Sequence, residues 1–312
     1  MESVKELSVI IPVVERYDDI AELYDLYKKG VEDSRRSHEF IFVIDGDFEE
    51  VLGALKRLIE EGENIKVIKL ARRFGEATAL TIGIQHSSGD IIITLPAYQQ
   101  VEASEIARLI ESLKDCDMVI ARRWPRKDSL LNRIQSRVFH MLLNPVSDFK
   151  FHDIGCGVRV FRKRVAQEVN IYGDQHRFLP ILAHKYGFQV LEVDAAQSQK
   201  DTLQRVYSPG IYVRRILDIF SIFFLVKFTK KPLRFFGILG SSVFAVGFLI
   251  LIYLLFTKVF QGVPLADRPA LLLGTLLVVL GVQVFAIGLL GEIIIFTHAK
   301  DIKEYSVEQV IN

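Results

Sequence analysis

Residues 91 to 106 read IIITLPAYQQVEASEI, a β-branched run followed by a short polar loop. In an α/β domain the loop after such a strand is where ligands bind, and carboxylates there can hold Mg²⁺ or Mn²⁺ beside a phosphate. This loop instead carries Pro96, Ala97 and Tyr98. Proline has no side-chain oxygen, and a phenol with a pKa of about 10 is a poor ligand for a hard cation at neutral pH. The loop therefore predicts a binding site without the usual pair of acids.

Basic side chains are the alternative means of binding a phosphate, because guanidinium groups can bind its oxygens in pairs without a metal. The residues concerned are Arg72, Arg73, Arg122, Arg123, Arg126 and Lys127. We expect all of them on loops at one edge of a sheet. Each alone would be an ordinary surface charge, whereas the group as a whole favours a phosphate-binding role.

Strands and helices alternate along the first part of the chain and must position these residues. We expect strands at 7–14, 40–44, 66–70, 91–95 and 118–121, and helices at 18–29, 51–61, 75–86 and 102–113. This alternation predicts an α/β fold with a mostly parallel sheet covered on both faces. The loops at 14–18, 45–49, 71–75, 95–102 and 121–128 would then form its ligand-binding edge.

The composition argues against several classes of protein. A formal net charge of +1 gives no general affinity for nucleic acid, which we do not expect as a partner. The two cysteines, Cys116 and Cys156, lie far apart and form no CxxC pair, so we expect neither a disulfide framework nor a zinc site. The polar start of the chain does not resemble a signal peptide.

Two long apolar segments near the end of the chain predict a transmembrane hairpin. Residues 235–256 carry no charge, and residues 270–296 carry only Glu292, which we expect to snorkel or to pair with a basic residue at the interface. Each segment exceeds the roughly 20 residues that cross a bilayer, which disfavours the alternative of buried core helices. Basic residues before the first span and after the second place both flanking parts on the cytoplasmic side of the cell membrane.

The chain is therefore expected to have four parts. These are a cytoplasmic α/β domain at 1–210, interfacial amphipathic helices at 211–234, two transmembrane helices at 235–297 and a cytoplasmic tail at 298–312. The second part contains IYVRRILDIFSIFFLVKF, whose mixture of large apolar and charged residues is typical of helices lying in the membrane interface. A buried globular helix is the alternative for this part.

The order of several motifs along the chain is similar to that of a known family. They are VIIPVVERYDDIAELY, FIFVIDGDFEEVL, IKLARRFGEATALTIGIQHSSGDIIIT, ARRWPRKDSLLNRIQSRVF, FHDIGCGVRVFRKRV and IYGDQHRFLPILAHKYGFQVLEV. Together they resemble the family-two glycosyltransferases of the glycosyltransferase-A fold, and most closely the polyprenyl-phosphate sugar synthases of the dolichol-phosphate mannose synthase kind. The resemblance covers nearly the whole chain. It implies a membrane enzyme that moves a sugar from a nucleotide-sugar donor to a polyprenyl-phosphate lipid.

The resemblance also implies roles for individual residues. It places donor-binding residues at Pro12, Glu15, Asp45, Arg73 and Gln100, and acceptor- or phosphate-binding residues at Arg123, Arg126, Asp128, His176 and Arg177. Asp153 would be the catalytic carboxylate near the acceptor, acting as general base. A lipid phosphate is already anionic, however, and needs positioning more than deprotonation. The alternatives are ordinary turn aspartates at Asp45 and Asp153 and a structural pair at His176 and Arg177.

The chain departs from the family pattern at three places. Ile44 replaces the first of two aspartates in the nucleotide-binding turn, Pro96 and Tyr98 fall on the two acids of the DxD motif, and AAQSQKDTLQRVYSPG lacks a His-Arg pair. Glu102 is a weak candidate metal ligand, because an acid there also suits the start of a helix. No cofactor is certain, Mg²⁺ or Mn²⁺ stays open, and we expect turnover with little or no metal dependence.

Two hypotheses of different classes remain at this stage. The first is an active membrane glycosyltransferase with an atypical donor site. The second is a catalytically inactive, glycosyltransferase-like pseudoenzyme that serves as a binding or scaffolding subunit. A third, a lipid-handling partner, would require a homo-oligomer, because two helices form no pathway alone. Titration with nucleotide sugars separates the first two.

Overall fold

The computed structural model describes residues 5–126, 151–169, 176, 178–202, 232–262, 264 and 268–298. The chain divides into two compact units, one containing residues 1–222 and 304–312 and the other containing residues 223–303. We call them the α/β unit and the hairpin unit. The expected interfacial helices at 211–234 fall largely outside the described residues.

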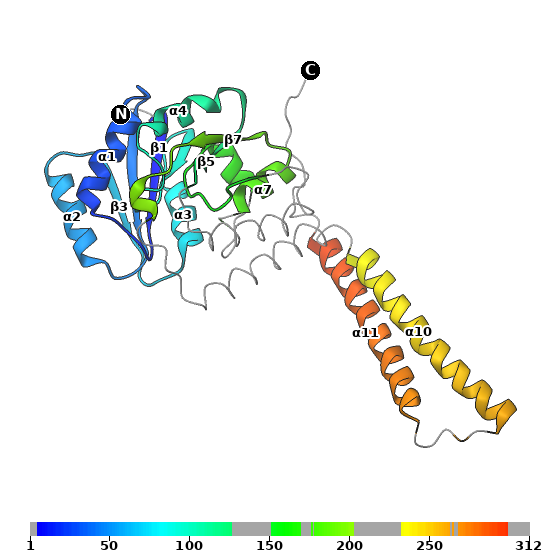
Figure 1. Cartoon of the computed structure of the whole chain (residues 1–312). Coiled ribbons are helices and arrows are strands. Elements are labelled where there is room, and N and C mark those ends of the chain that lie inside the picture. The colour runs from blue at the N-terminus through cyan, green and yellow to red at the C-terminus, as the bar shows by residue number, and fades with distance from the viewer. Residues whose placement is uncertain are drawn as a thin grey trace. The chain divides into compact units, whose positions relative to one another are not determined.

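A seven-stranded sheet forms the centre of the α/β unit (Figure 1). Its strands are β1 (Leu7–Val13), β2 (His38–Ile44), β3 (Ile65–Lys69), β4 (Ile91–Thr94), β5 (Met118–Arg123), β6 (Arg159–Arg162) and β7 (Val190–Ala195), in the order β3-β2-β1-β4-β6-β5-β7. Only β6 runs antiparallel to its neighbours among these strands. The predicted mostly parallel sheet is therefore confirmed, and β6 and β7 complete it.

Helices connect the strands and cover the sheet. They are α1 (Ile20–Glu32), α2 (Glu49–Glu60), α3 (Glu76–Gln85), α4 (Glu105–Glu111) with the 3₁₀ turn η1 (Ser112–Asp115), α6 (Lys163–Glu168), α7 (Leu179–Lys185) and α8 (Gln199–Thr202). The first begins after Asp19, whose carboxylate accepts a hydrogen bond from the Glu22 backbone at 3.0 Å. This N-cap satisfies one of the amide donors left free in the first turn.

Most element boundaries differ from the prediction by a few residues, and three of them bear on the site. The first strand ends at Val13, one residue early, and tolerates Pro12, because the backbone amide that proline lacks would point to the side on which β4 has already ended. The helix expected from residue 102 begins at Glu105, because the Glu102 amide donates instead to the Ala196 carbonyl at 2.9 Å. The fifth strand extends to Arg123, so Arg122 and Arg123 lie in a strand and not on a loop as expected.

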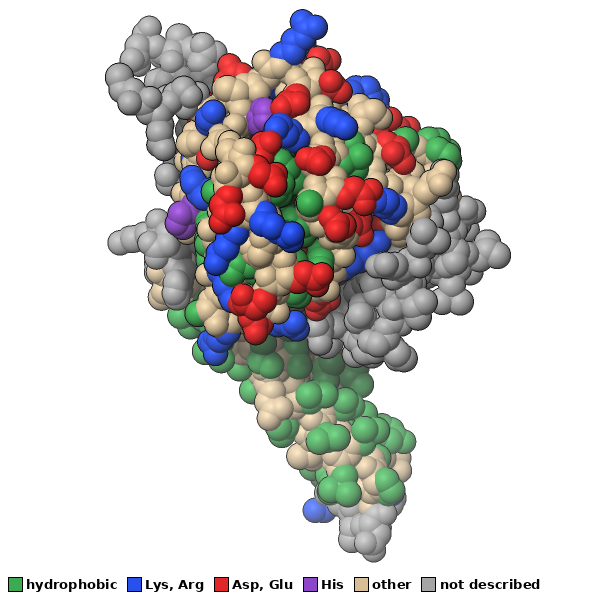
Figure 2. Space-filling model, turned by 90° about the vertical axis from the view of Figure 1, so that its left-hand side faces the viewer, with side chains coloured by type: hydrophobic (Ala, Val, Ile, Leu, Met, Phe, Trp, Pro, Cys, Tyr) green, Lys and Arg blue, Asp and Glu red, His purple; other side chains and the backbone are tan. Residues whose placement is uncertain are grey.

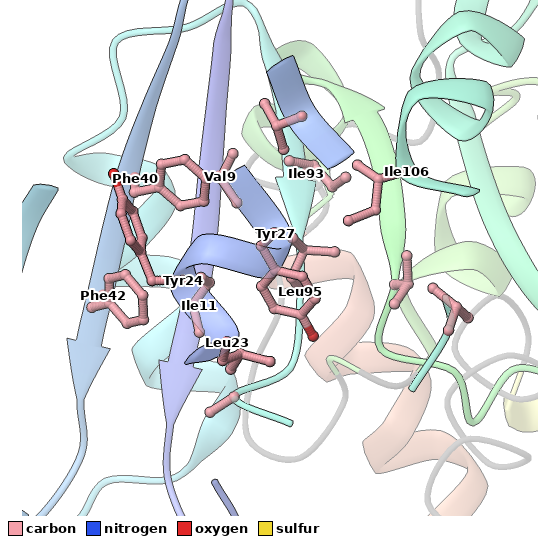
Figure 3. Close-up of a cluster of buried hydrophobic side chains, with 14 of the residues drawn as sticks. Val9, Ile11, Leu23, Tyr24, Tyr27, Phe40, Phe42, Ile93, Leu95 and Ile106 are labelled. Carbon is pink, nitrogen blue, oxygen red and sulfur yellow. The ribbon is translucent and has the colours of Figure 1, made fainter. Parts of the chain in front are cut away.

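The face of the sheet against α1 forms the main hydrophobic core (Figure 3). Tyr24 and Tyr27 of α1 are almost fully buried, and the Tyr24 ring packs edge-to-face on Phe40 with centroids 5.0 Å apart. Burial of each such side chain stabilises the fold by about 2 kcal/mol. The Tyr27 hydroxyl points toward the end of β4, so this core also reaches the loop that follows that strand.

The hairpin unit consists of α10 (Pro232–Gln261) and α11 (Pro269–His298), each long and apolar enough to cross a membrane. Only 17% and 11% of their most apolar windows are buried. A core helix of a globular protein would be mostly buried, so the alternative of two core helices is not supported. Apolar side chains cover the hairpin in Figure 2, whereas the α/β unit shows acidic and basic side chains intermixed.

Glycines bring the two long helices into backbone contact. A Cβ atom at Gly281 would lie 2.5 Å from the Phe244 backbone nitrogen, and one at Gly240 would lie 2.7 Å from the Gly281 carbonyl oxygen. Membrane helices associate through such small residues, because close packing replaces the hydrophobic effect that is absent in lipid. Toward the end of α11, the Glu292 carboxylate accepts a hydrogen bond from the Leu233 amide in the first turn of α10, at 3.4 Å.

Candidate active site

Two loops at the carboxyl edge of the sheet are joined into one platform. The Asp18 amide, after β1, donates to the Ala97 carbonyl at 2.8 Å, and the Asp18 carboxylate accepts from the Gln99 amide at 2.9 Å. From below, the buried Tyr27 hydroxyl lies 3.0 Å from the carbonyl oxygens of both Pro96 and Tyr98. Burial raises the pKa of Tyr27, and the neighbouring Tyr98 adds to this, so the phenol remains a hydrogen-bond donor. The loop after β4 is therefore held from two sides.

An arginine that the sequence did not single out lies on this platform. The guanidinium carbon of Arg16 is 3.9 Å from the centroid of the Tyr98 ring. Its Nη2 donates to the Lys200 carbonyl at 3.2 Å, and its Nη1 lies 3.9 Å from a carboxylate oxygen of Asp201. The Arg16 side chain keeps 22% of its surface exposed. A positive charge is thus held against the residue that the resemblance assigns to the second acid of the DxD motif.

Gln100 joins this platform to the loop before β6. Its Nε2 donates to the Tyr98 hydroxyl at 2.6 Å, and its Oε1 accepts from the Gly157 amide at 2.8 Å. The side chain is buried, with 4% of the residue exposed. Its amide is therefore occupied by protein groups, and the predicted contact with a donor is not supported. Gln100 orients the Tyr98 ring instead.

The oxygen atoms around this loop do not fit a hard divalent cation. Pro96 offers no side-chain oxygen and Tyr98 offers only a phenol. Of the nearby acids, Asp18 accepts from a backbone amide, and Glu102 lies 3.4 Å from the Nε2 of Gln99. Within the described ranges no group of three His, Cys, Asp or Glu side chains is arranged to hold a metal ion. Glu102 is therefore not supported as a metal ligand.

Asp45, after β2, shapes a second loop of the same edge. Its two carboxylate oxygens accept from the backbone amides of Phe74 and Gly75, each at 2.7 Å, and the residue is fully buried. Gly75 has a φ of +99°, a conformation that a side chain would strain. Both oxygens of Asp45 are therefore used to hold the loop from β3 to α3, and this gives no support to a contact with the nucleotide, which stays a prediction.

The loop held by Asp45 presents Arg73, one of the predicted donor-binding residues. Arg73 is exposed, and its guanidinium lies 5.6 Å from the centroid of the Phe48 ring, which packs edge-to-face with Tyr17 at 5.5 Å. These two rings and one cation form a shelf beside the ends of β1 and β2. Of the other predicted donor-binding residues, Glu15 is exposed on the loop after β1, whereas Pro12 is buried within the strand.

A buried ion cluster lies on the other side of the site. Arg123 donates through Nε and Nη2 to the two oxygens of Asp153, at 2.7 and 2.8 Å, and through Nη1 to Asp201 at 3.1 Å. The exposed fractions of these side chains are 2%, 3% and 0%. Two carboxylates therefore occupy donors of Arg123, which argues against its predicted phosphate-binding role. We call these three residues the ion cluster.

The ion cluster also decides the chemistry of Asp153. Burial alone would raise the pKa of this carboxyl, but Arg123, with a further contribution from Arg126, outweighs burial and lowers the pKa to about 2. A carboxylate with so low a pKa accepts a proton poorly at neutral pH. The low pKa thus favours a positioning role for Asp153 over general-base catalysis.

The remaining predicted acceptor residues have different outcomes. Arg126 is partly exposed, and its Nη2 lies 3.9 Å from Asp153, at the border between the ion cluster and the surface. His176 is 4% exposed, and its Nε2 lies 3.1 Å from a Glu76 carboxylate oxygen, so it contacts the start of α3. Lys127, Asp128 and Arg177 lie outside the described residues.

Sequence reasoning missed the segment that closes the ion cluster. Gln197 donates to Asp201 at 2.7 Å, and the Ser198 amide donates to the Gln100 carbonyl at 3.0 Å. This segment belongs to the polar stretch that departs from the family pattern. A lone aspartate in a polar stretch carries no local signal, and only its distant partner Arg123 shows its role.

Comparison with known proteins gives three findings. The profile of the family described as Glycosyl transferase family 2 matches residues 8–169. The dodecaprenyl-phosphate galacturonate synthase of Rhizobium johnstonii is 28% identical over 98% of this chain and 93% of its own length. The undecaprenyl-phosphate 4-deoxy-4-formamido-L-arabinose transferase of Photorhabdus laumondii is also 28% identical, over 99% of this chain and 95% of its own length.

A solved structure resembles the α/β fold at lower sequence identity. Glucosyl-3-phosphoglycerate synthase from Mycobacterium tuberculosis, in complex with Mg²⁺ and UDP, aligns with a TM-score of 0.53 and 12% identity. The alignment covers 70% of this chain and 78% of that one. At this identity the likeness concerns the fold alone.

Proposed function

This chain belongs to glycosyl transferase family 2, and we propose that it transfers a sugar from a nucleotide-sugar donor to a polyprenyl phosphate in a membrane. Relatives similar over nearly the full length are named for transfer to dodecaprenyl or undecaprenyl phosphate. The α/β unit has the glycosyltransferase-A type of fold, and the same chain carries two helices able to cross a membrane. The observation that carries the proposal is this union of a sugar-transfer fold and a membrane hairpin in one chain.

The proposed reaction assigns the two sides of the site to the two substrates. The donor lies over the loops after β1 to β4, where Arg73 and the Phe48 ring offer a cation and a stacking surface. The acceptor lies on the side of β5, where Arg126 borders the ion cluster and attracts an anionic phosphate. Nucleotide sugars bind sheets of this type at the carboxyl ends of the strands, as this assignment requires.

The chemistry requires no general base in this chain. An oxygen of the lipid phosphate attacks the anomeric carbon of the sugar, the bond from that carbon to the diphosphate breaks, and the nucleoside diphosphate leaves with the bonding electrons. The attacking oxygen is already ionised at neutral pH, so no proton has to be removed. This agrees with the low pKa of Asp153, which suits it to hold Arg123 and Arg126 in place.

We place the α/β unit on the cytoplasmic side of the membrane. The stretch KFTKKPLR, which leads into the first turn of α10, is rich in basic residues, and such residues remain on the cytoplasmic side of membrane helices. The four-part organisation with boundaries at 210, 234 and 297 belongs to the same proposal. Labelling single cysteines introduced into the loop between α10 and α11, in intact cells, tests the orientation.

A transfer assay tests the function. The full chain is placed in lipid vesicles containing undecaprenyl phosphate, each of several radiolabelled nucleotide sugars is added, and label in the lipid fraction is measured. We expect lipid-linked product with at least one donor. Vesicles without the prenyl phosphate are the control. Binding of a nucleotide sugar without product would favour the alternative of an inactive binding subunit, and absence of both would contradict the proposal.

A further inference from the structure

The side chains of Pro96 and Tyr98, in the loop after β4, do not fit a divalent cation, but the positively charged Arg16 lies beside them. We propose that Arg16, held against the Tyr98 ring, supplies the positive charge that neutralises the diphosphate of the donor in this chain. This inference rests on the proposed function, because it requires a nucleotide donor. Arg16 is not among the residues that the sequence predicted to bind phosphate.

The first argument concerns the type of residue at position 98. The face of an aromatic ring attracts a cation, and an arginine stacked at 3.9 Å is within the range of a cation–π interaction. A ring carries no net charge, so it holds the guanidinium without cancelling it. An aspartate at this position would pair with Arg16 and neutralise it. The aromatic residue and the nearby arginine are therefore a consistent pair, whereas an acid and this arginine would not be.

The second argument concerns the charge that remains on Arg16. Its Nη2 donates to a neutral carbonyl, that of Lys200. Among the described residues its acidic neighbour is Asp201, whose Oδ1 lies 3.9 Å away, while the other oxygen of that carboxylate accepts from Arg123 at 3.1 Å and from Gln197 at 2.7 Å. Around the ion cluster three arginines, Arg16 and Arg126 being the others, face two aspartates. The excess positive charge lies on the more exposed members.

The third argument concerns the rigidity of the pair. The ring plane of Tyr98 is set by Gln100, whose Nε2 donates to the hydroxyl at 2.6 Å, and its backbone is held by Tyr27 at 3.0 Å. The loop that carries Arg16 is tied to the same platform through Asp18. In addition, the Nε of Arg16 is buried and makes no hydrogen bond with the part of the chain that the structure describes. A preorganised cation that retains a hydrogen-bond donor suits binding of an anion.

Binding measurements test the inference without relying on turnover. UDP, GDP and inorganic pyrophosphate are each titrated into the full chain in lipid nanodiscs, once in EDTA and once with Mg²⁺. We expect binding in EDTA, with little gain from Mg²⁺. The Arg16→Gln variant should lose at least about tenfold in affinity, the usual effect of removing one charge-assisted contact. The Arg57→Gln variant, which removes an exposed arginine on α2, is the matched control and should bind as the wild type does.

Variants at position 98 separate the ring from the hydroxyl. Tyr98→Phe keeps the ring but loses the hydrogen bond from Gln100, so it should lose less affinity than Tyr98→Leu, which should lose about fivefold, the effect of a lost cation–π contact. The paired change Pro96→Asp/Tyr98→Asp should reverse the metal response, so that binding is weak in EDTA and restored by Mg²⁺. Unfolding curves for each variant show that the protein remains folded.

Each outcome supports or overturns the inference. Nucleotide binding that requires Mg²⁺ and is unchanged in Arg16→Gln would overturn it while leaving the proposed function intact. Failure of all three probes to bind the folded wild type under either condition would overturn both. Equal loss in Tyr98→Phe and Tyr98→Leu would show that the hydroxyl, and not the ring, is what matters, and would contradict the role assigned to the ring.

Discussion

Arginines on the two sides of the site behave in opposite ways. Arg123, in β5, is 2% exposed and donates hydrogen bonds to Asp153 and Asp201. Arg16, in contrast, is 22% exposed and stacks on an uncharged ring. The same side chain therefore stabilises the fold on one side and remains available to a ligand on the other. The difference is set by what each arginine faces, a pair of carboxylates or an aromatic surface, and it predicts different costs for removing each charge.

Removal of the buried arginine should have the largest effect. Arg123→Met leaves two buried carboxylates without their main counter-charge, since Arg126 and Arg16 each lie 3.9 Å away, and this costs about 3 to 5 kcal/mol of unfolding free energy. The single tryptophan, Trp124, is adjacent and reports unfolding by fluorescence. Arg122, the neighbour of Arg123, is the matched control, because Arg122 is partly exposed and pairs with Asp194 at 3.4 Å. Arg122→Gln should cost less than about 1 kcal/mol, and equal costs for the two variants would refute the comparison.

Acid should weaken the ion cluster within a defined window. The pKa of Asp153 lies at about 2 in the folded chain against an ordinary value of 3.8. Because the folded value is the lower one, its stabilisation is complete above pH 3.8 and is lost as the pH falls toward 2. The loss amounts to about 2 kcal/mol.

Denaturant unfolding at several pH values, compared between wild type and Asp153→Asn, isolates this contribution from that of other carboxyls. The wild type should lose more stability than the variant between about pH 4 and pH 2. Parallel curves for the two proteins over that interval would be inconsistent with a stabilising ion pair at Asp153.

Tyr27 connects the hydrophobic core to the loop of Tyr98, against which the exposed Arg16 stacks. Tyr27→Phe removes hydrogen bonds to the Pro96 and Tyr98 carbonyls and should cost about 1 kcal/mol of stability. It should also weaken pyrophosphate binding, because the platform under Arg16 is then less fixed. Tyr24→Phe, which loses a hydroxyl bonded to Glu63 instead, is the control and should leave pyrophosphate binding unchanged.

The smallest effect on stability is expected at the exposed arginine on the loop before α3. Arg73→Gln should change the unfolding free energy by less than about 0.5 kcal/mol, as exposed substitutions do. Its effect should appear in binding, with UDP affinity lowered more than pyrophosphate affinity, because Arg73 stacks near the Phe48 ring where a base would lie. Calorimetric titration of both probes checks this, and an unchanged ratio of the two affinities would place the nucleotide elsewhere.

The parts of the molecule that follow a local pattern were predictable from sequence. The strands, the helices and the two membrane segments each depend on the periodicity or apolarity of neighbouring residues. The absence of carboxylates at Pro96 and Tyr98 was also visible, because the sequence alone shows that neither side chain is an acid. Arg73 lies on the predicted loop for the same local reason.

The details of the site depended on distant partners and were not predictable. Arg123 looked like its neighbour Arg122 in sequence, and only contacts 30 and 78 residues away bury it. Arg16 and Asp201 had no motif of their own, and Asp45 was assigned to a ligand although two backbone amides occupy it. Local patterns thus identify the loops, while long-range pairing decides which side chains in them remain free to bind.

The glycines of α10 and α11 restrict how a lipid can be handled. Where Gly240 and Gly281 meet, there is no room for even one added methyl group. An isoprenoid tail is far thicker than a methyl group, so it cannot pass through the seam between the two helices. Such a tail must instead run along the outside of the pair, within the surrounding annulus of acyl chains. The lipid part of a product made at the surface would therefore stay outside this seam.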